Sequence, residues 1–128
     1  IMQNVNFDWL YVKDLLPVAE RFVREDPAAN VYNVTSGRAI DLLSVANMIN
    51  AGSDYKSEIL VENPGMNREY SGSNERLLRD FGGVRFTDMG DAIAELSDYY
   101  RRCMDSIDCD VIRQDPYAAG CKVSLPGK

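Results

Sequence analysis

Short β-rich segments alternate with amphipathic helical patterns along most of the chain. Residues 7–12, 31–34 and 58–61 are rich in aromatic, β-branched and aliphatic side chains, which predicts three short strands. Between them, two stretches carry apolar residues at three- and four-residue spacing, which predicts helices. Because strands separated by a helix favour a parallel crossover, we expect an α/β fold with a few short, partly parallel strands.

About four helices are expected, each with a start signal. Asp14 and Asp41 can cap the first two, a short helix is predicted over 74–81, and a last one begins after Thr87 or Asp88. Gly52 is expected directly after the second helix. The apolar stripes that we expect to face the core are, in chain order, Leu15, Val18, Ala19, Phe22 and Val23, then Leu42, Val45, Ala46 and Ile49, then Leu77, Leu78 and Phe81, and finally Met89, Ala92, Ile93, Leu96, Tyr99 and Tyr100.

Charge and hydropathy argue against two classes of partner. The 128 residues include 14 Lys and Arg against 20 Asp and Glu, a net charge of −6, whereas a nucleic-acid interface needs clustered positive charge. No apolar run approaches the roughly 20 residues that span a bilayer, and the first residues lack a signal-peptide pattern. We therefore expect a cytoplasmic protein with no nucleic-acid or membrane partner. Because the chain begins with Ile1, we expect a piece of a longer protein or a processed product.

The residue inventory also limits the chemistry. The chain contains no His, which excludes Ser-His-Asp and Cys-His catalysis and HExxH zinc sites. Cys103, Cys109 and Cys121 match no zinc or redox spacing and are interpreted as reduced thiols, with a disulfide in the tail as the alternative. We interpret the carboxylates of 88–98 as a solvated helix face rather than a metal site, and 36–38 as a turn rather than a phosphate-binding loop.

Several segments, in one order, resemble a known family. Residues 7–15, FDWLYVKDL, resemble the R-D-F-V-Y-V-D-D-L segment of the extended short-chain dehydrogenases/reductases, the group of NAD-dependent nucleotide-sugar epimerases and dehydratases. The other similar segments follow in family order: 31–37 to V-Y-N-V-G-S-G, 39–43 to P-V-S-L-L, 64–68 to P-G-D-x-R, 74–82 to K-A-x-x-x-L-G, and 97–100 to the closing T-V-x-W-Y. The resemblance covers about residues 5–102 and leaves 103–128 as an irregular extension.

The resemblance implies the small C-terminal, substrate-binding subdomain of such an enzyme, over 1–102, with the Rossmann half absent. The family's G-x-x-G-x-x-G turn for NAD and its Tyr-x-x-x-Lys catalytic pair do not occur in the chain. It is therefore expected to hold no catalytic residue and no cofactor by itself, and to be inactive alone. NAD(P), the N-terminal Rossmann portion of the same protein and a sugar-nucleotide substrate are implied for the parent. A stand-alone, non-catalytic binding or interaction module derived from that fold is the alternative.

Four residues are candidates for substrate binding by this resemblance. Arg68 falls on the family's arginine after P-G-D, and a guanidinium suits a diphosphate; a surface arginine paired with Glu69 or Glu62 is the alternative. Asn63 and Phe7 stand where family members carry arginines. Asn63 and Asn67 could bond a sugar or a phosphate, or serve turn chemistry. Phe7 could stack on a base or sugar, or belong to the core.

The resemblance also predicts an exposed apolar surface. In the family, the strand at 31–34 and the preceding helix pack against the Rossmann half. A chain without that half should expose this surface and self-associate through it.

Overall fold

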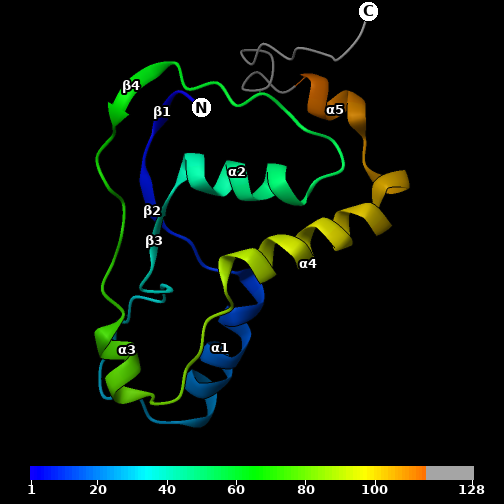
Figure 1. Cartoon of the computed structure of the whole chain (residues 1–128). Coiled ribbons are helices and arrows are strands. Elements are labelled where there is room, and N and C mark those ends of the chain that lie inside the picture. Colours follow the sequence, from blue (N-terminus) through cyan, green and yellow to red (C-terminus); the bar gives the residue numbers. More distant parts are fainter. Residues whose placement is uncertain (115–128) are drawn as a thin grey trace, which may run out of the picture. The chain divides into compact units, whose positions relative to one another are not determined.

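The computed structural model describes residues 1–114 (Figure 1). Its α-helices are α1 (Leu15–Arg24), α2 (Leu42–Gly52), α3 (Glu75–Asp80), α4 (Met89–Arg102) and α5 (Cys109–Gln114), with 3₁₀ turns at Val12–Asp14 and Met104–Ser106. Its strands are β1 (Gln3–Asn4), β2 (Asn6–Asp8), β3 (Ala39–Asp41) and β4 (Asn63–Met66). The predicted mixed α/β class is confirmed at this coarse level. Within the described residues, no helix combines the length and apolar character needed to cross a membrane.

Strand pairing is organised around the N-terminal segment. β1 pairs in parallel with β4, and β2 pairs antiparallel with β3, so that Phe7 lies opposite Ile40. Beyond β4 the chain continues beside β2, where Phe7 forms a bridge with Tyr70. The Tyr70 amide donates to the Asn6 carbonyl at 2.9 Å, and the Asp8 amide donates to the Tyr70 carbonyl at 3.2 Å. β2 therefore has a neighbour on each side.

The strand predictions were only partly right. The strand predicted over 7–12 ends at Asp8, because the chain turns into a 3₁₀ helix at Val12. Residues 31–34 and 58–61 form no strand, so the predicted crossover between them is wrong. No backbone-to-backbone hydrogen bond joins 31–34 to another described segment. β1 pairs instead with the Pro-Gly stretch of β4, where Pro64 is tolerated because β4 has a partner on one side only.

The core of residues 1–94 lies between α1 and α3. Val18, Leu77 and Phe81 are buried, and Leu77 is fully enclosed, which stabilises the fold by roughly 1.5–3 kcal/mol for such a side chain. Phe22 and Tyr32 pack on Phe81, with the three ring centroids 4.9 to 5.4 Å apart. The helix predicted over 74–81 is thus confirmed as α3, and its buried face anchors the core.

Several residues of the predicted apolar stripes are exposed. On α1, Val18 packs in the core and Phe22 packs against it, whereas Leu15, Ala19 and Val23 are exposed, Val23 by 86%. Leu78, Ile49, Leu96, Tyr99 and Tyr100 are exposed as well. The exposed residues Val12, Leu16, Ala19 and Val23 follow a four-three-four spacing and are called here the α1 outer face. A single amphipathic stripe was expected on α1, but its apolar residues divide between two faces.

Of the predicted caps, Asp41 is confirmed. Its carboxylate accepts hydrogen bonds from the backbone amide of Ser44 at 3.0 Å and from the Ser44 hydroxyl. The Asn4 amide nitrogen also donates to it at 2.8 Å. Hydrogen bonds from Ser44, and then from Asn4, lower the pKa of Asp41 from 3.8 to about 2. This aspartate therefore joins the start of α2 to β1.

Asp14 does not cap α1, contrary to prediction. Its carboxylate accepts from the Thr87 amide at 2.8 Å and the Thr87 hydroxyl at 2.6 Å. Asp88 is confirmed as the cap of α4, since its Oδ1 accepts from the Gly90 amide at 2.9 Å. Gly52 lies within the last turn of α2 rather than after it. A distant partner therefore outcompetes the local cap at Asp14.

The residues from Glu95 onward form a second unit. It contains the later part of α4 and, in the expected irregular extension, the 3₁₀ turn and α5, so residues 104–114 are largely helical. Asp108 begins α5 by accepting from the amides of Asp110 and Val111. Cys103 and Cys109 carry free thiols. Cys121 and the rest of the extension lie outside the described residues.

Candidate functional site

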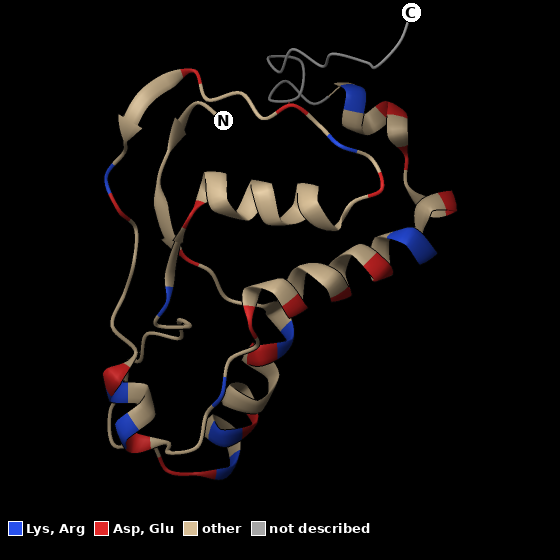
Figure 2. Ribbon diagram, in the orientation of Figure 1, with Lys and Arg blue, Asp and Glu red and all other residues tan. Residues whose placement is uncertain are grey.

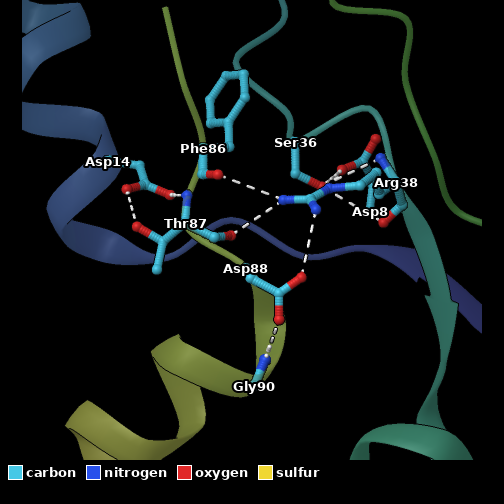
Figure 3. A network of polar contacts seen from close by, with 8 residues as sticks. All are labelled: Asp8, Asp14, Ser36, Arg38, Phe86, Thr87, Asp88 and Gly90. Atoms are coloured by element: carbon cyan, nitrogen blue, oxygen red, sulfur yellow. Dashed lines mark hydrogen bonds and ion pairs between the residues drawn. The ribbon is translucent and has the colours of Figure 1, made fainter.

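The hydrogen-bond donors of the turn at 36–38 bind acceptors elsewhere in the same chain (Figure 3). Arg38 donates to the carbonyls of Phe86 and Thr87 at 3.4 and 3.2 Å, and to Asp88 at 3.4 Å. The Asp8 carboxylate accepts from the Ser36 hydroxyl at 2.7 Å and from the turn's central amide at 3.2 Å. Because these donors already have protein acceptors, they are not available to a phosphate. The interpretation of this segment as a turn is confirmed.

Residues 63–70, the β4 strip, have a fixed backbone and exposed side chains. The Asn63 amide donates to the Met2 carbonyl at 2.9 Å, and the Asn67 amide donates to the Asn4 carbonyl at 2.7 Å. The amide side chain of Asn4 bonds Asp41 and accepts from the Leu43 amide at 3.0 Å. The strip is therefore held by its backbone, while its side chains remain open to solvent.

Arg68 is exposed, and its guanidinium has no partner among residues 1–114. Its backbone amide donates to the Asn67 side-chain oxygen at 2.7 Å. The expected alternative, a pair with Glu69, does not form, because Glu69 accepts from the Ser71 hydroxyl and from Asn6 at 3.2 Å. These hydrogen bonds, first that of Ser71, lower the pKa of Glu69. Arg68 is thus a positive charge available to a ligand.

Phe7 is half-buried and belongs to an aromatic group. Its ring centroid lies 5.3 Å from that of Trp9 and 6.3 Å from that of Tyr70, both edge-to-face. The Trp9 ring nitrogen donates to the Ile40 carbonyl at 3.0 Å, which fixes the indole. Phe7 is therefore in contact with an exposed residue, Tyr70, which is 78% exposed.

Tyr70 follows Arg68 by two residues in the strip, and its bridge places it beside Phe7. The sequence analysis missed Tyr70, although its position two residues after Arg68 was a usable signal. Of the other candidates, Asn67 turns its amide oxygen back to the chain, and the exposed Asn63 side chain has no partner among the described residues.

The β4 strip offers both a guanidinium, that of Arg68, and an aromatic ring, that of Tyr70. A guanidinium binds two oxygens of a phosphate in a planar fork, and an exposed aromatic ring offers an apolar face with a polar tip to a sugar or base. Figure 2 shows that basic residues are sparse along β4 and the segment that follows it. The arrangement suits binding and orientation of a polar, phosphate-bearing ligand.

The acidic residues predicted to form a solvated helix face make local contacts. Asp88 bonds Arg38 and Gly90, and Asp98 pairs with Arg101 at 2.8 Å. Among residues 1–114, no group of three or more Cys, Asp or Glu side chains is placed to hold a metal ion. These carboxylates therefore have protein partners of their own.

No protein-family model, curated protein or solved structure matches the chain. A proposal about function must therefore start from the residues and contacts just described.

Proposed function

We propose that this chain is the substrate-binding part of a cytoplasmic, NAD-dependent nucleotide-sugar epimerase, dehydratase or reductase. The observation that carries the proposal is the unpartnered guanidinium of Arg68 on the same strip as the exposed ring of Tyr70. Arg68 ends the segment that resembles P-G-D-x-R, and Tyr70, two residues later, bridges Phe7 in the segment that resembles R-D-F-V-Y-V. The strip that the resemblance singles out is thus one that can bind a ligand.

Each part of a nucleotide sugar has a partner on the β4 strip. Arg68 donates to the diphosphate. The Tyr70 ring, which contacts the Phe7 ring edge-to-face, stacks on the sugar or the base. Asn63 adds an amide that can bond a hydroxyl. Contacts remote from the reacting carbon raise the rate by positioning it, which is the part we assign to this chain.

Two uncovered surfaces support a Rossmann portion as the partner. The α1 outer face exposes Val12, Leu16 and Val23 by two-thirds or more, and residues 31–34 have no backbone hydrogen bond to another described segment. An exposed apolar helix face and a segment without a strand partner are surfaces that a sheet with covering helices would bury. In isolation these surfaces would self-associate.

NAD(P) belongs to the partner in this proposal. A dinucleotide pyrophosphate needs free backbone amides at a glycine-rich turn before a helix. The 36–38 turn does not fit, because Asp8 occupies the amide of Gly37 and carbonyls occupy Arg38. The role proposed for this chain is therefore to bind and orient the substrate, while the partner holds the cofactor.

A stand-alone binding module is the second candidate. Phe7 and Asn63 replace the two arginines expected from the resemblance, and Phe7 is engaged with Trp9 and Tyr70 rather than with solvent. One guanidinium instead of three gives a weaker diphosphate site. A face of this kind could serve binding without catalysis.

The test uses Trp9, the only tryptophan, as a fluorescent reporter beside Phe7. UDP-glucose and dTDP-glucose are titrated into the 128-residue chain and into Arg68→Gln. We expect the sugar nucleotides to change the Trp9 emission, and Arg68→Gln to weaken binding by about tenfold, since one charged hydrogen-bond pair is lost.

The matched control is Arg24→Gln, because Arg24 is also exposed and, among residues 1–114, pairs only with Glu20, at 2.8 Å. It should bind as tightly as the wild type. Equal affinity of Arg68→Gln and wild type would contradict the substrate-binding role. The intact mass of the native gene product then separates the two candidates: a mass well above 14.4 kDa supports the enzyme, and a mass near it supports the module.

A further inference from the structure

A hollow lies beside α3, outside the β4 strip. Its volume is about 320 Å³, and it is lined by Val31, Asn33, Ser73, Glu75, Arg76 and Arg79. None of these residues belongs to the β4 strip or to the α1 outer face. Figure 2 shows charges of both signs close together along α3. The hollow therefore forms an independent candidate site.

Two guanidiniums on α3 line this hollow and are held in place. Arg76 Nη1 donates to the Val31 carbonyl at 3.1 Å, and Arg79 Nε pairs with Asp80 at 2.9 Å. Three residues apart on a helix, they lie on one side of it. Each keeps further N–H donors beyond the bond that fixes it. Two positioned cations with spare donors make an anion-binding pair.

Neutral donors complete the lining. The Ser73 hydroxyl accepts from the Glu75 amide at 3.3 Å, which leaves its own O–H to donate. Asn33 donates to the Ser73 carbonyl at 3.2 Å, which leaves its amide oxygen to accept. Glu75 is the one carboxylate of the lining, and Asp80 pairs with Arg79 beside it, so two carboxylates balance the two arginines. Anion binding here therefore depends on the spare N–H donors of the arginines together with the Ser73 hydroxyl.

We infer that this hollow binds the phosphate group of a small phosphorylated hydroxy compound. The arginines and the serine hydroxyl hold the phosphate oxygens, and Asn33 and Glu75 accept hydrogen bonds from the hydroxyls. The volume lies at the lower end of the range for small-molecule pockets, about 300–1,000 Å³. It therefore suits a three- to six-carbon phosphate ester better than a nucleotide. This site is separate from the proposed sugar-nucleotide face.

The test is an NMR titration of the ¹⁵N-labelled chain at low salt with inorganic phosphate, glycerol 3-phosphate and glycerol. We expect the amides of residues 33 and 73–79 to shift with both phosphates and not with glycerol. A tighter dissociation constant for the ester identifies a phosphate ester as ligand, and equal constants identify free phosphate. No shift at these amides, or equal shifts at Arg24 and Arg101, would overturn the inference.

Four variants sharpen the test. Arg79→Gln should weaken binding by about fivefold or more, because a charged donor is lost. Glu75→Gln should tighten it, because the opposing charge is removed. Arg24→Gln should leave it unchanged. Arg76→Gln also removes the bond to Val31, so its binding is compared only after its thermal unfolding matches wild type. If Arg79→Gln binds phosphate like wild type, the site is refuted, whatever Arg68→Gln does with sugar nucleotides.

Discussion

Arg38 and Arg68 each follow soon after a glycine with positive φ, but the two arginines have different surroundings. Gly37 has φ 73° and directly precedes Arg38, whereas Gly65 has φ 81° and lies three residues before Arg68. Arg38 donates to two carbonyls and to Asp88. The Arg68 guanidinium has no partner among residues 1–114. A glycine with positive φ shortly before an arginine thus accompanies an arginine bonded to the protein at Arg38 and an arginine available to a ligand at Arg68.

The difference comes from what surrounds each turn. The chain brings Asp8 and the segment 86–88 against the 36–38 turn, so protein acceptors bind Ser36, the amide of Gly37 and the guanidinium of Arg38. The β4 strip has a partner strand on one side only, and no acceptor lies against the guanidinium of Arg68 within the described residues. Whether an arginine can serve a ligand is therefore decided by tertiary acceptors rather than by the local motif.

The largest effect should come from exchanging the two glycines for alanine. Both positions have positive φ, which costs an L-residue roughly 1–2 kcal/mol. At Gly37 the added Cβ would also lie 3.0 Å from the Nδ2 of buried Asn74, whereas at Gly65 nothing lies within 4 Å. We expect Gly37→Ala to lower the free energy of unfolding by about 2–4 kcal/mol, and Gly65→Ala by about half as much.

The free energies of unfolding of Gly37→Ala and Gly65→Ala are measured by urea denaturation followed by circular dichroism. Asn74 donates to the Thr35 carbonyl at 2.8 Å, so moving it breaks a buried hydrogen bond. A second variant, Asn74→Ala, opens space for the new methyl group. If Gly37→Ala and Gly65→Ala were equally destabilising, the close contact at Asn74 would not distinguish the two turns.

The sequence predicted local structure well and pairing poorly. The cap at Asp41 and the helix over 74–81 follow from signals within a few residues, and both are confirmed. The 31–34 segment has the composition of a strand, yet a strand also needs a partner, which no described segment supplies. Asp14 was expected to cap α1, but Thr87, 73 residues away, takes its carboxylate.

For the site, the sequence could indicate residue types but not their surroundings. Arg68 was a candidate phosphate ligand and the 36–38 segment was interpreted as a turn, but only the tertiary contacts show which of the two arginines has protein acceptors. Tyr70 was missed because its value depends on the bridge that places it beside Phe7. The hollow at α3 needed the distant residues Val31 and Asn33, which no motif connects to Arg79.

A smaller effect should separate the two arginines in stability. Arg38→Gln removes a half-exposed ion pair and two bonds to carbonyls, so we expect a loss of about 1 kcal/mol in the free energy of unfolding. Arg68→Gln should change it by less than about 0.5 kcal/mol, because no protein bond is lost. Chemical denaturation of both variants gives the comparison. A larger loss for Arg68→Gln would show that the strip's cation is a structural residue after all.

The last prediction concerns the loss of stability at low pH. It depends on Asp41, which with Asn4 joins β1 to α2. The pKa of Asp41 is lowered from 3.8 to about 2, chiefly by its hydrogen bond from Ser44 and then by that from Asn4. The folded state therefore binds this proton less readily than the unfolded state. The stability that the ionised carboxylate contributes is complete above about pH 4 and is lost as the pH falls toward 2. Asp41→Asn keeps an N-cap acceptor but carries no charge and cannot titrate. It should therefore be less stable than wild type at pH 7, and the decline between pH 4 and 2 should become shallower.

Thermal unfolding of wild type and Asp41→Asn across this pH range measures that slope. Part of the decline should survive in the variant, because hydrogen bonds also lower the pKa of Glu69 and of Asp80. Glu69 lies on the strip itself and Asp80 beside the core, so Glu69→Gln and Asp80→Asn assign the remainder to one region or the other. A parallel course of the wild-type and Asp41→Asn curves would mean that the carboxylate at the start of α2 does not hold the backbone beneath Arg68. The strip would then depend on β1 pairing alone.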